Sequence, residues 1–237
     1  MGLGGLRVVL FALGRQGAGF ERARTLPLLH LIGDGRALPD ARGHLLLIVG
    51  TDELEVERAL LAGELGCPGC GGRLRSWGFG RWRNIRCRGR EQRRRPRRSR
   101  CVGCAVTHVL ISTDTLLRRR DQVGVIGAAL VAAAAGVGHR RVAVLSGVAV
   151  STARGWLRRF AANAEHVRVW FTVLAHDLDP MLGPIVARAT VVGDAVEAIG
   201  VAARAVSLRL GPVEAWLFAS AASRGRLLSN TGWPLVS

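Results

Sequence analysis

The chain has 237 residues, enough for one ordinary domain or for two to three small ones. Its net charge is +17 and all 34 basic residues are arginine, which predicts a polyanionic partner, most often a nucleic acid. Five cysteines exclude a simple secreted disulfide framework, and the longest apolar run, residues 123–138, is too short to span a bilayer. We therefore expect a cytoplasmic, nucleoid-associated protein without a membrane partner.

The basic charge is concentrated in one part of the chain. Alanine, glycine, valine and arginine are abundant throughout, as a GC-rich genome produces, so the total arginine count is weak evidence by itself. Residues 73–100, however, hold thirteen arginines and one acid, whereas residues 171–237 hold five of each. The clustering points to a polyanion-binding segment.

Residues 1–44 show no sustained hydrophobic period and no motif. We interpret them as a disordered extension or as upstream sequence translated from a wrongly assigned start codon, with a genuine loose tail as the alternative. Residues 45–66 follow as a lead-in. They predict a strand in "HLLLIVG" and then a helix, because Thr51 or Asp52 precedes early acids and apolar residues at helical spacing.

Residues 67–112 predict a small β zinc ribbon. Two CxxC pairs separated by 30 residues suit one tetrahedral Zn²⁺ ion, since each pair forms a tight turn that presents two thiolates. The segments "RLRSW", "RWRNIR" and "RRRPRRSR" between the pairs can supply short strands. Metal binding would supply much of the stability of so small a module. The predicted ligands are Cys67, Cys70, Cys101 and Cys104.

Two further residues of this module have chemistry that suits a metal. We expect Cys87 to pack as a small apolar residue and give it a lesser role as an alternative ligand. His108 lies four residues after Cys104 and could replace a cysteine, but four sulfur atoms already complete a tetrahedral shell. We therefore expect His108 to begin the strand after the second CxxC pair.

The ribbon also carries the residues expected to meet a nucleic acid. Trp77, Phe79 and Trp82 could stack on bases. Because the ribbon has few other apolar residues, we expect at least one of the three to be buried. Arginines of the insert are expected to contact phosphates: Arg94, Arg95, Arg97 and Arg98.

Residues 118–163 predict a helix-turn-helix, with a first helix over 121–135, a break at "GVGH", and two helices separated by a turn at Ser146 and Gly147. Ala143 is the small residue where the last two helices cross, and Gly147 is the turn glycine that needs a positive φ. The positions spaced to bury the second helix against the first are Val148, Ala153 and Trp156.

The opposite face of that second helix is the expected recognition face. It presents Ala149, Val150, Ser151, Arg154 and Arg158, of which the two arginines lie one turn apart and could reach guanine edges or phosphates. Three other arginines are placed for phosphates: Arg140, Arg141 and Arg159. The alternative is an ordinary helical hairpin with an exposed basic face.

Residues 164–228 predict two or three amphipathic helices, and residues 229–237 a polar tail. Apolar residues of "GDAVEAIGVAARAVSLRLG" at helical spacing suit a core or a homodimer surface. Asp179 and Glu214 have the 35-residue spacing of the last two catalytic acids of RNase H-like transposases, but the strands that would carry such acids are lacking. We therefore expect no enzymatic activity.

The chain resembles an actinobacterial protein family of unknown function over about residues 45–228. The resemblance is carried by the CPxCG pair, the arginine-rich insert, "RCxxCxxTHVL" and a helix-turn-helix ending in "TARGWLRRF". Proteins of this family resemble the N-terminal DNA-binding parts of transposases. The resemblance implies an α+β protein, in which a small zinc ribbon with four cysteine ligands precedes a mainly α-helical region with a helix-turn-helix.

These observations together predict a non-catalytic, sequence-specific binder of double-stranded DNA, either a transcription regulator or a transposon-derived protein. Two alternatives stay open. One is an accessory or truncated transposase protein that works with a catalytic partner. The other is an RNA-binding zinc-ribbon protein whose helices contact other proteins.

Overall fold

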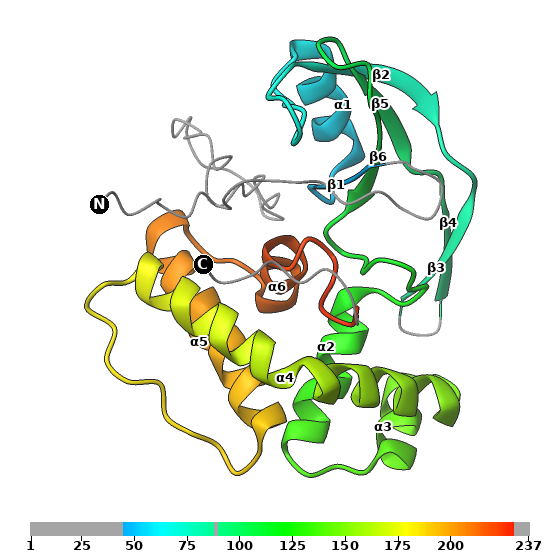
Figure 1. The fold of residues 1–237 in the computed structure, drawn as a ribbon. Coiled ribbons are helices and arrows are strands. Elements are labelled where there is room, and N and C mark those ends of the chain that lie inside the picture. The colour runs from blue at the N-terminus through cyan, green and yellow to red at the C-terminus, as the bar shows by residue number, and fades with distance from the viewer. Residues whose placement is uncertain (1–44, 88–89, 230–237) are drawn as a thin grey trace, which may run out of the picture. The chain divides into compact units, whose positions relative to one another are not determined.

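The computed structural model describes residues 45–87 and 90–229 (Figure 1). They form a mixed α+β structure, as the sequence predicted. The chain divides into two compact units. The first, described from Leu45, runs to Arg83 and resumes with Arg94–Thr113. The second comprises the described residues of Asn84–Arg93 and the chain from Asp114, described as far as Ser229. The predicted extension over residues 1–44 and the predicted tail beyond Ser229 lie outside the described residues.

The first unit is a four-stranded sheet with one helix, α1. The strand order is β1-β6-β5-β2, with β1 parallel to β6 and with β5 antiparallel to both of its neighbours. The strands predicted from "RLRSW" and "RRRPRRSR" correspond to β2 and β5. The elements are β1 (Leu45–Val49), α1 (Glu53–Ala62), β2 (Leu74–Phe79), β5 (Arg97–Cys101) and β6 (Thr107–Ser112).

Helix α1 has clear start and stop signals. The Asp52 carboxylate accepts hydrogen bonds from the Leu54 and Glu55 amides, and Gly63 ends the helix at φ 72°. The apolar face of α1 belongs to the buried core of the unit. Figure 1 shows the helix beside the sheet. Residues 45–66, predicted as a separate lead-in, thus contribute a strand and a helix to the ribbon unit. The buried core is Val49, Val56, Ala59, Leu60, Leu65, Cys67, Leu74, Cys101 and Leu110.

The second unit is mainly helical, with a two-stranded sheet of β3 and β4. The Arg86 guanidinium makes two contacts with the buried Asp121 carboxylate, at 2.9 and 3.0 Å, and Arg86 and Asp121 form a backbone bridge. This ion pair joins β3 to the start of the helical part of its own unit. The elements are β3 (Arg83–Cys87), β4 (Arg90–Arg94), α2 (Val123–Ala134), α3 (His139–Ser146), α4 (Val150–Leu178), α5 (Val191–Leu210) and α6 (Ala215–Ala222).

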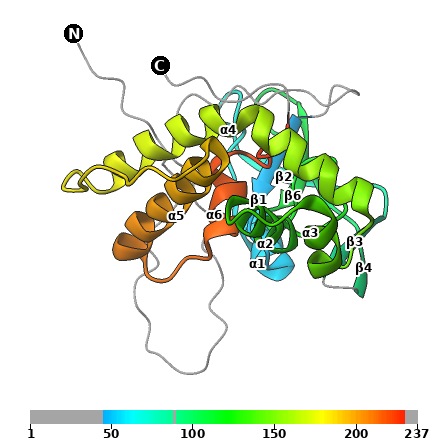
Figure 2. The ribbon, with the colours of Figure 1, turned by 90° about the horizontal axis from the view of Figure 1, so that it is seen from below.

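Helix α4 is much longer than the sequence analysis predicted. It crosses the expected boundary between residues 163 and 164 and ends only at Leu178. It continues because its apolar residues keep the helical spacing, and its buried residues pack against α5 and also against α3 and α2. The two helices run side by side in both views (Figure 1 and Figure 2).

The apolar positions of α5, for which a core and a partner surface were both considered, belong mainly to the core. Ile199, Val201, Ala203 and Val206 are buried, whereas Leu208 is exposed. A homodimer through these helices stays a prediction.

Among the described residues, no helix is both long and apolar enough to cross a membrane.

Two glycines of helix α2 offer a test of how α2 packs against α6. A Cβ atom at Gly127 would lie 2.2 Å from the Trp216 indole of α6, whereas a Cβ atom at Gly124 would meet nothing within 4 Å. We expect Gly127→Ala to lower the free energy of unfolding by roughly 1–3 kcal/mol because the indole must move. Gly124→Ala should raise it by up to about 1 kcal/mol, since alanine favours helix. Urea unfolding of both variants measures this, and equal effects would contradict the α2–α6 packing.

Candidate metal centre and nucleic-acid interface

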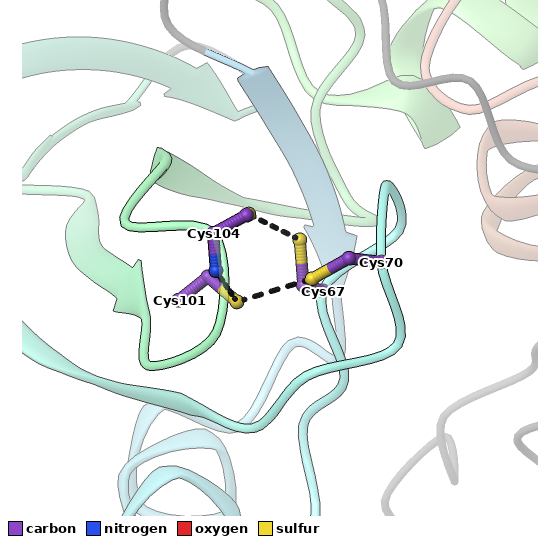
Figure 3. A group of neighbouring side chains, drawn as sticks. All are labelled: Cys67, Cys70, Cys101 and Cys104. Carbon is purple, nitrogen blue, oxygen red and sulfur yellow. Dashed lines mark hydrogen bonds between the residues drawn. The ribbon is translucent and has the colours of Figure 1, made fainter.

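The four predicted ligands lie together in the first unit. The sulfur atoms of Cys67, Cys70, Cys101 and Cys104 are all within 4.8 Å of one another, and none forms a disulfide. Figure 3 shows them converging from two separate loops. The shortest separations are 3.4 Å between Cys70 and Cys101 and 3.7 Å between Cys67 and Cys104. Sulfur atoms around a tetrahedral metal with bonds of about 2.3 Å are about 3.8 Å apart, so the cluster fits one metal ion.

The two loops have matching backbone geometry. In the first, the Gly71 amide donates to the Cys67 carbonyl at 2.8 Å, and in the second the Ala105 amide donates to the Cys101 carbonyl at 3.1 Å. Both Gly71 and Ala105 have positive φ, 72° and 60°. Alanine rarely adopts this conformation, so the second loop is held in it by its surroundings. At Gly72 a Cβ atom would lie 3.0 Å from the Cys101 sulfur, a tighter contact than most Cβ atoms make, so glycine favours the close approach of the first loop.

The electrostatics of the cluster are uneven. Burial raises the pKa of the Cys67 thiol to about 12, whereas the Cys104 amide, 3.5 Å from the Cys101 sulfur, is the main cause that lowers the pKa of Cys101 to about 7. Burial therefore favours the neutral form of the Cys67 thiol, and a nearby cation would favour the thiolate. A metal ion bound by all four sulfur atoms would supply that charge.

His108 lies beside the cluster. It is the second residue of β6, so the expectation that it begins the strand after the second CxxC pair is confirmed. Its Nε2 is 3.4 Å from the Cys67 sulfur, and its buried Nδ1 has no hydrogen-bond partner among the described residues. Burial lowers the pKa of His108, which favours the neutral ring. A proton on Nδ1 would leave a buried N–H group without a partner. We therefore place the proton on Nε2, where the N–H group donates to the Cys67 sulfur. The sequence offered only the spacing from Cys104 as a signal for this contact.

Cys87, the fifth cysteine, stands apart. It is half-buried at the end of β3 and is not part of the four-cysteine cluster. It is therefore the natural control for experiments on the other four.

The predicted recognition face is exposed on α4. Val150, Ser151, Arg154 and Arg158 are exposed, as are Arg140 and Arg141 on α3, whereas Arg159 is half-buried and its guanidinium donates to the Gly155 carbonyl. The buried partners are Ala143, Ala153 and Trp156; Val148, predicted to be inward, is half-buried. Gly147, in the connection between α3 and α4, has φ 64°. A basic helix face beside a tight turn is thus in place.

The predicted phosphate-contacting arginines are spread over β4, the following loop and β5. Arg94 ends β4, Arg95 lies in the loop, and Arg97 and Arg98 belong to β5. Arg97 forms an ion pair with Glu57 of α1, which offsets part of its charge.

The expectation that one of the ribbon aromatics would be buried is wrong. Trp77, Phe79 and Trp82 are 44, 49 and 53% exposed. The core of the unit is instead completed by aliphatic residues of β1 and α1, such as Val49 and Leu60, which the sequence analysis had not joined to the ribbon.

The two acids with transposase-like spacing have local structural roles. Asp179 follows the last residue of α4, and its carboxylate accepts from the Met181 amide at 3.1 Å. Glu214 caps α6 by accepting from the Leu217 amide at 2.6 Å.

Comparison of the chain with protein-family models, curated proteins and solved structures finds no match.

The cluster predicts how cysteine variants behave. Cys67→Ser should lose the bound metal ion and lower the thermal stability of the protein, because a hydroxyl is a poor ligand beside three thiolates. Cys87→Ser should keep both. Metal content per chain by elemental analysis, with a melting curve on the same sample, measures the difference. Full metal content in a Cys101→Ser, Cys104→Ser double variant would rule out the cluster as the site.

Proposed function

We propose that the protein is a non-catalytic, sequence-specific binder of double-stranded DNA with zinc in its four-cysteine site. The observation that carries the proposal is the pair of helices α3 and α4. They are joined through Gly147 in a left-handed conformation, packed through the buried Ala143, and they carry Arg154 and Arg158 on an exposed face. Such a face suits the major groove, where arginine pairs with guanine.

Zinc is the metal that suits the site best. Four sulfur ligands at tetrahedral spacing favour zinc or iron. The cluster links two loops of a small sheet, and two of its cysteines belong to the apolar core. That is a structural role which needs no electron transfer, and zinc has no redox chemistry. Cys67, Cys70, Cys101 and Cys104 would hold the ion.

The recognition face predicts a loss of specificity when its arginines are removed. On a DNA site selected from random sequences, Arg154→Ala or Arg158→Ala should each weaken binding by roughly 1–3 kcal/mol, with a much smaller loss on scrambled DNA, since a base contact is lost. Paired titrations on the two DNAs at two salt concentrations measure this difference.

A matched control lies on the same helix. Arg168 lies about 15 Å beyond Arg158 along α4 and forms an ion pair with Glu165. Arg168→Ala should bind the selected site like the unaltered protein. If Arg154→Ala and Arg158→Ala weaken binding to both DNAs equally, α4 is no recognition helix, and the RNA-binding alternative gains support.

A further inference from the structure

The first unit exposes aromatic rings where a small sheet would normally bury them. Trp77 and Phe79 belong to β2, and Trp82 follows in the loop before β3. About half of each side chain is exposed, and none belongs to the core of the unit. Large aromatic side chains gain much from burial, so three exposed rings within six residues indicate a surface that a partner covers.

Guanidinium groups lie over these rings. The Arg95 guanidinium is 5.3 Å from the Phe79 ring centre and 5.7 Å from that of Trp82. Arg97 lies 4.4 Å from Phe79, and Arg100 lies 4.7 Å from Trp77. Guanidiniums and rings thus lie over one another in two groups, one of Arg97, Phe79, Arg95 and Trp82 and one of Arg100 and Trp77. We call the two groups together the arginine–aromatic surface. Its members are Trp77, Phe79, Trp82, Arg95, Arg97 and Arg100.

Hydrogen bonds to the backbone hold this surface in place. Arg95 donates from Nε to the Gly80 carbonyl at 3.1 Å, and Arg100 donates from Nε to the Ala105 carbonyl at 3.1 Å. Each of these bonds uses one of five N–H groups, so the guanidinium keeps donors for a ligand. Planar groups fixed before binding lose less conformational entropy when a ligand arrives.

The segments that carry the surface are strongly basic. Residues 74–83 and 94–101 contain eight arginines and no acid. The ion pair that the structure gives to Arg97 comes from Glu57, on α1. A partner that covers the surface must therefore offer several negative charges together with flat groups that stack on rings.

We propose that the arginine–aromatic surface binds single-stranded DNA, with unpaired bases stacked on the rings and guanidinium planes and with phosphates on the surrounding arginines. Duplex DNA presents phosphates but keeps its base faces covered by neighbouring pairs. An acidic peptide would satisfy the guanidiniums and leave the rings without a partner. The choice of DNA over RNA rests on the proposed function, to which this surface adds a second, different nucleic-acid contact.

The experiment separates stacking from phosphate binding. The full chain is titrated with a labelled fifteen-nucleotide thymidine strand and with an abasic strand of the same length and charge. The unaltered protein should bind the thymidine strand about tenfold more tightly or better, because each stacked base contributes to affinity. Equal affinity for the two strands would overturn the proposal, whatever any variant does.

Variants then assign the preference to the rings. Trp82→Leu alone should reduce it, and Trp77→Leu, Phe79→Leu, Trp82→Leu together should abolish it while binding to the abasic strand stays unchanged. Leu61→Ala, which removes an exposed apolar side chain from α1 of the same unit, should leave the preference intact. A triple variant that keeps its metal content and also keeps the full preference for thymidine would overturn the assignment to these rings.

Two further measurements show which part of the proposal fails. Tighter binding to a uridine RNA strand than to the thymidine strand would overturn the choice of DNA. A failure of the proposed duplex function would appear in a different experiment, as equal binding to the selected and the scrambled duplex. The comparison of the thymidine strand with the abasic strand does not depend on that result.

Discussion

Four cysteine sulfur atoms within 4.8 Å of one another cannot all be negatively charged unless a cation lies among them. The first unit depends on this constraint, because Cys67 and Cys101 are also members of its apolar core. A change in the charge of the cluster therefore alters the environment of the apolar residues in the same core, among them Leu65 and Leu74. A metal ion in the cluster would therefore couple occupancy of the site to the stability of the sheet.

The same coupling reaches the outer surface of the unit. Strand β5 ends in Cys101 of the four-cysteine cluster, and the preceding residue, Arg100, lies over Trp77. Arg100 also donates to the carbonyl of Ala105, directly after Cys104 of the same cluster. The second cysteine loop and the arginine–aromatic surface are thus joined through Arg100 and this hydrogen bond. A well-ordered cysteine loop therefore helps to hold the arginine–aromatic surface in place, and the reverse also holds.

Local patterns in the sequence predicted local features well. The CxxC spacing identified the four clustered cysteines, and Gly147 was assigned the positive φ that it has. Long-range pairing was missed, since nothing in "HLLLIVG" specifies that its strand lies beside β6 rather than another strand. That missing strand and α1 explain why the aromatic residues were wrongly expected in the core. The end of α4 was misplaced because polar residues after Phe160 interrupt the pattern briefly, although Ala164, Val167 and Phe171 continue it.

The parallel pairing of β1 with β6 has a consequence for the chain as it is synthesised. Ser112, the last residue of β6, is made 63 residues after its partner Val49. At about 5–20 residues per second, β1 waits roughly 3–13 s with an edge that has no neighbour. Cys67 and Cys70 wait for Cys101 and Cys104 during part of the same interval. Strand pairing and completion of the four-cysteine cluster thus become possible at nearly the same moment, late in the synthesis of the unit. Until then the edge of β1 that pairs with β6 and two free thiols are open to other molecules in the cell.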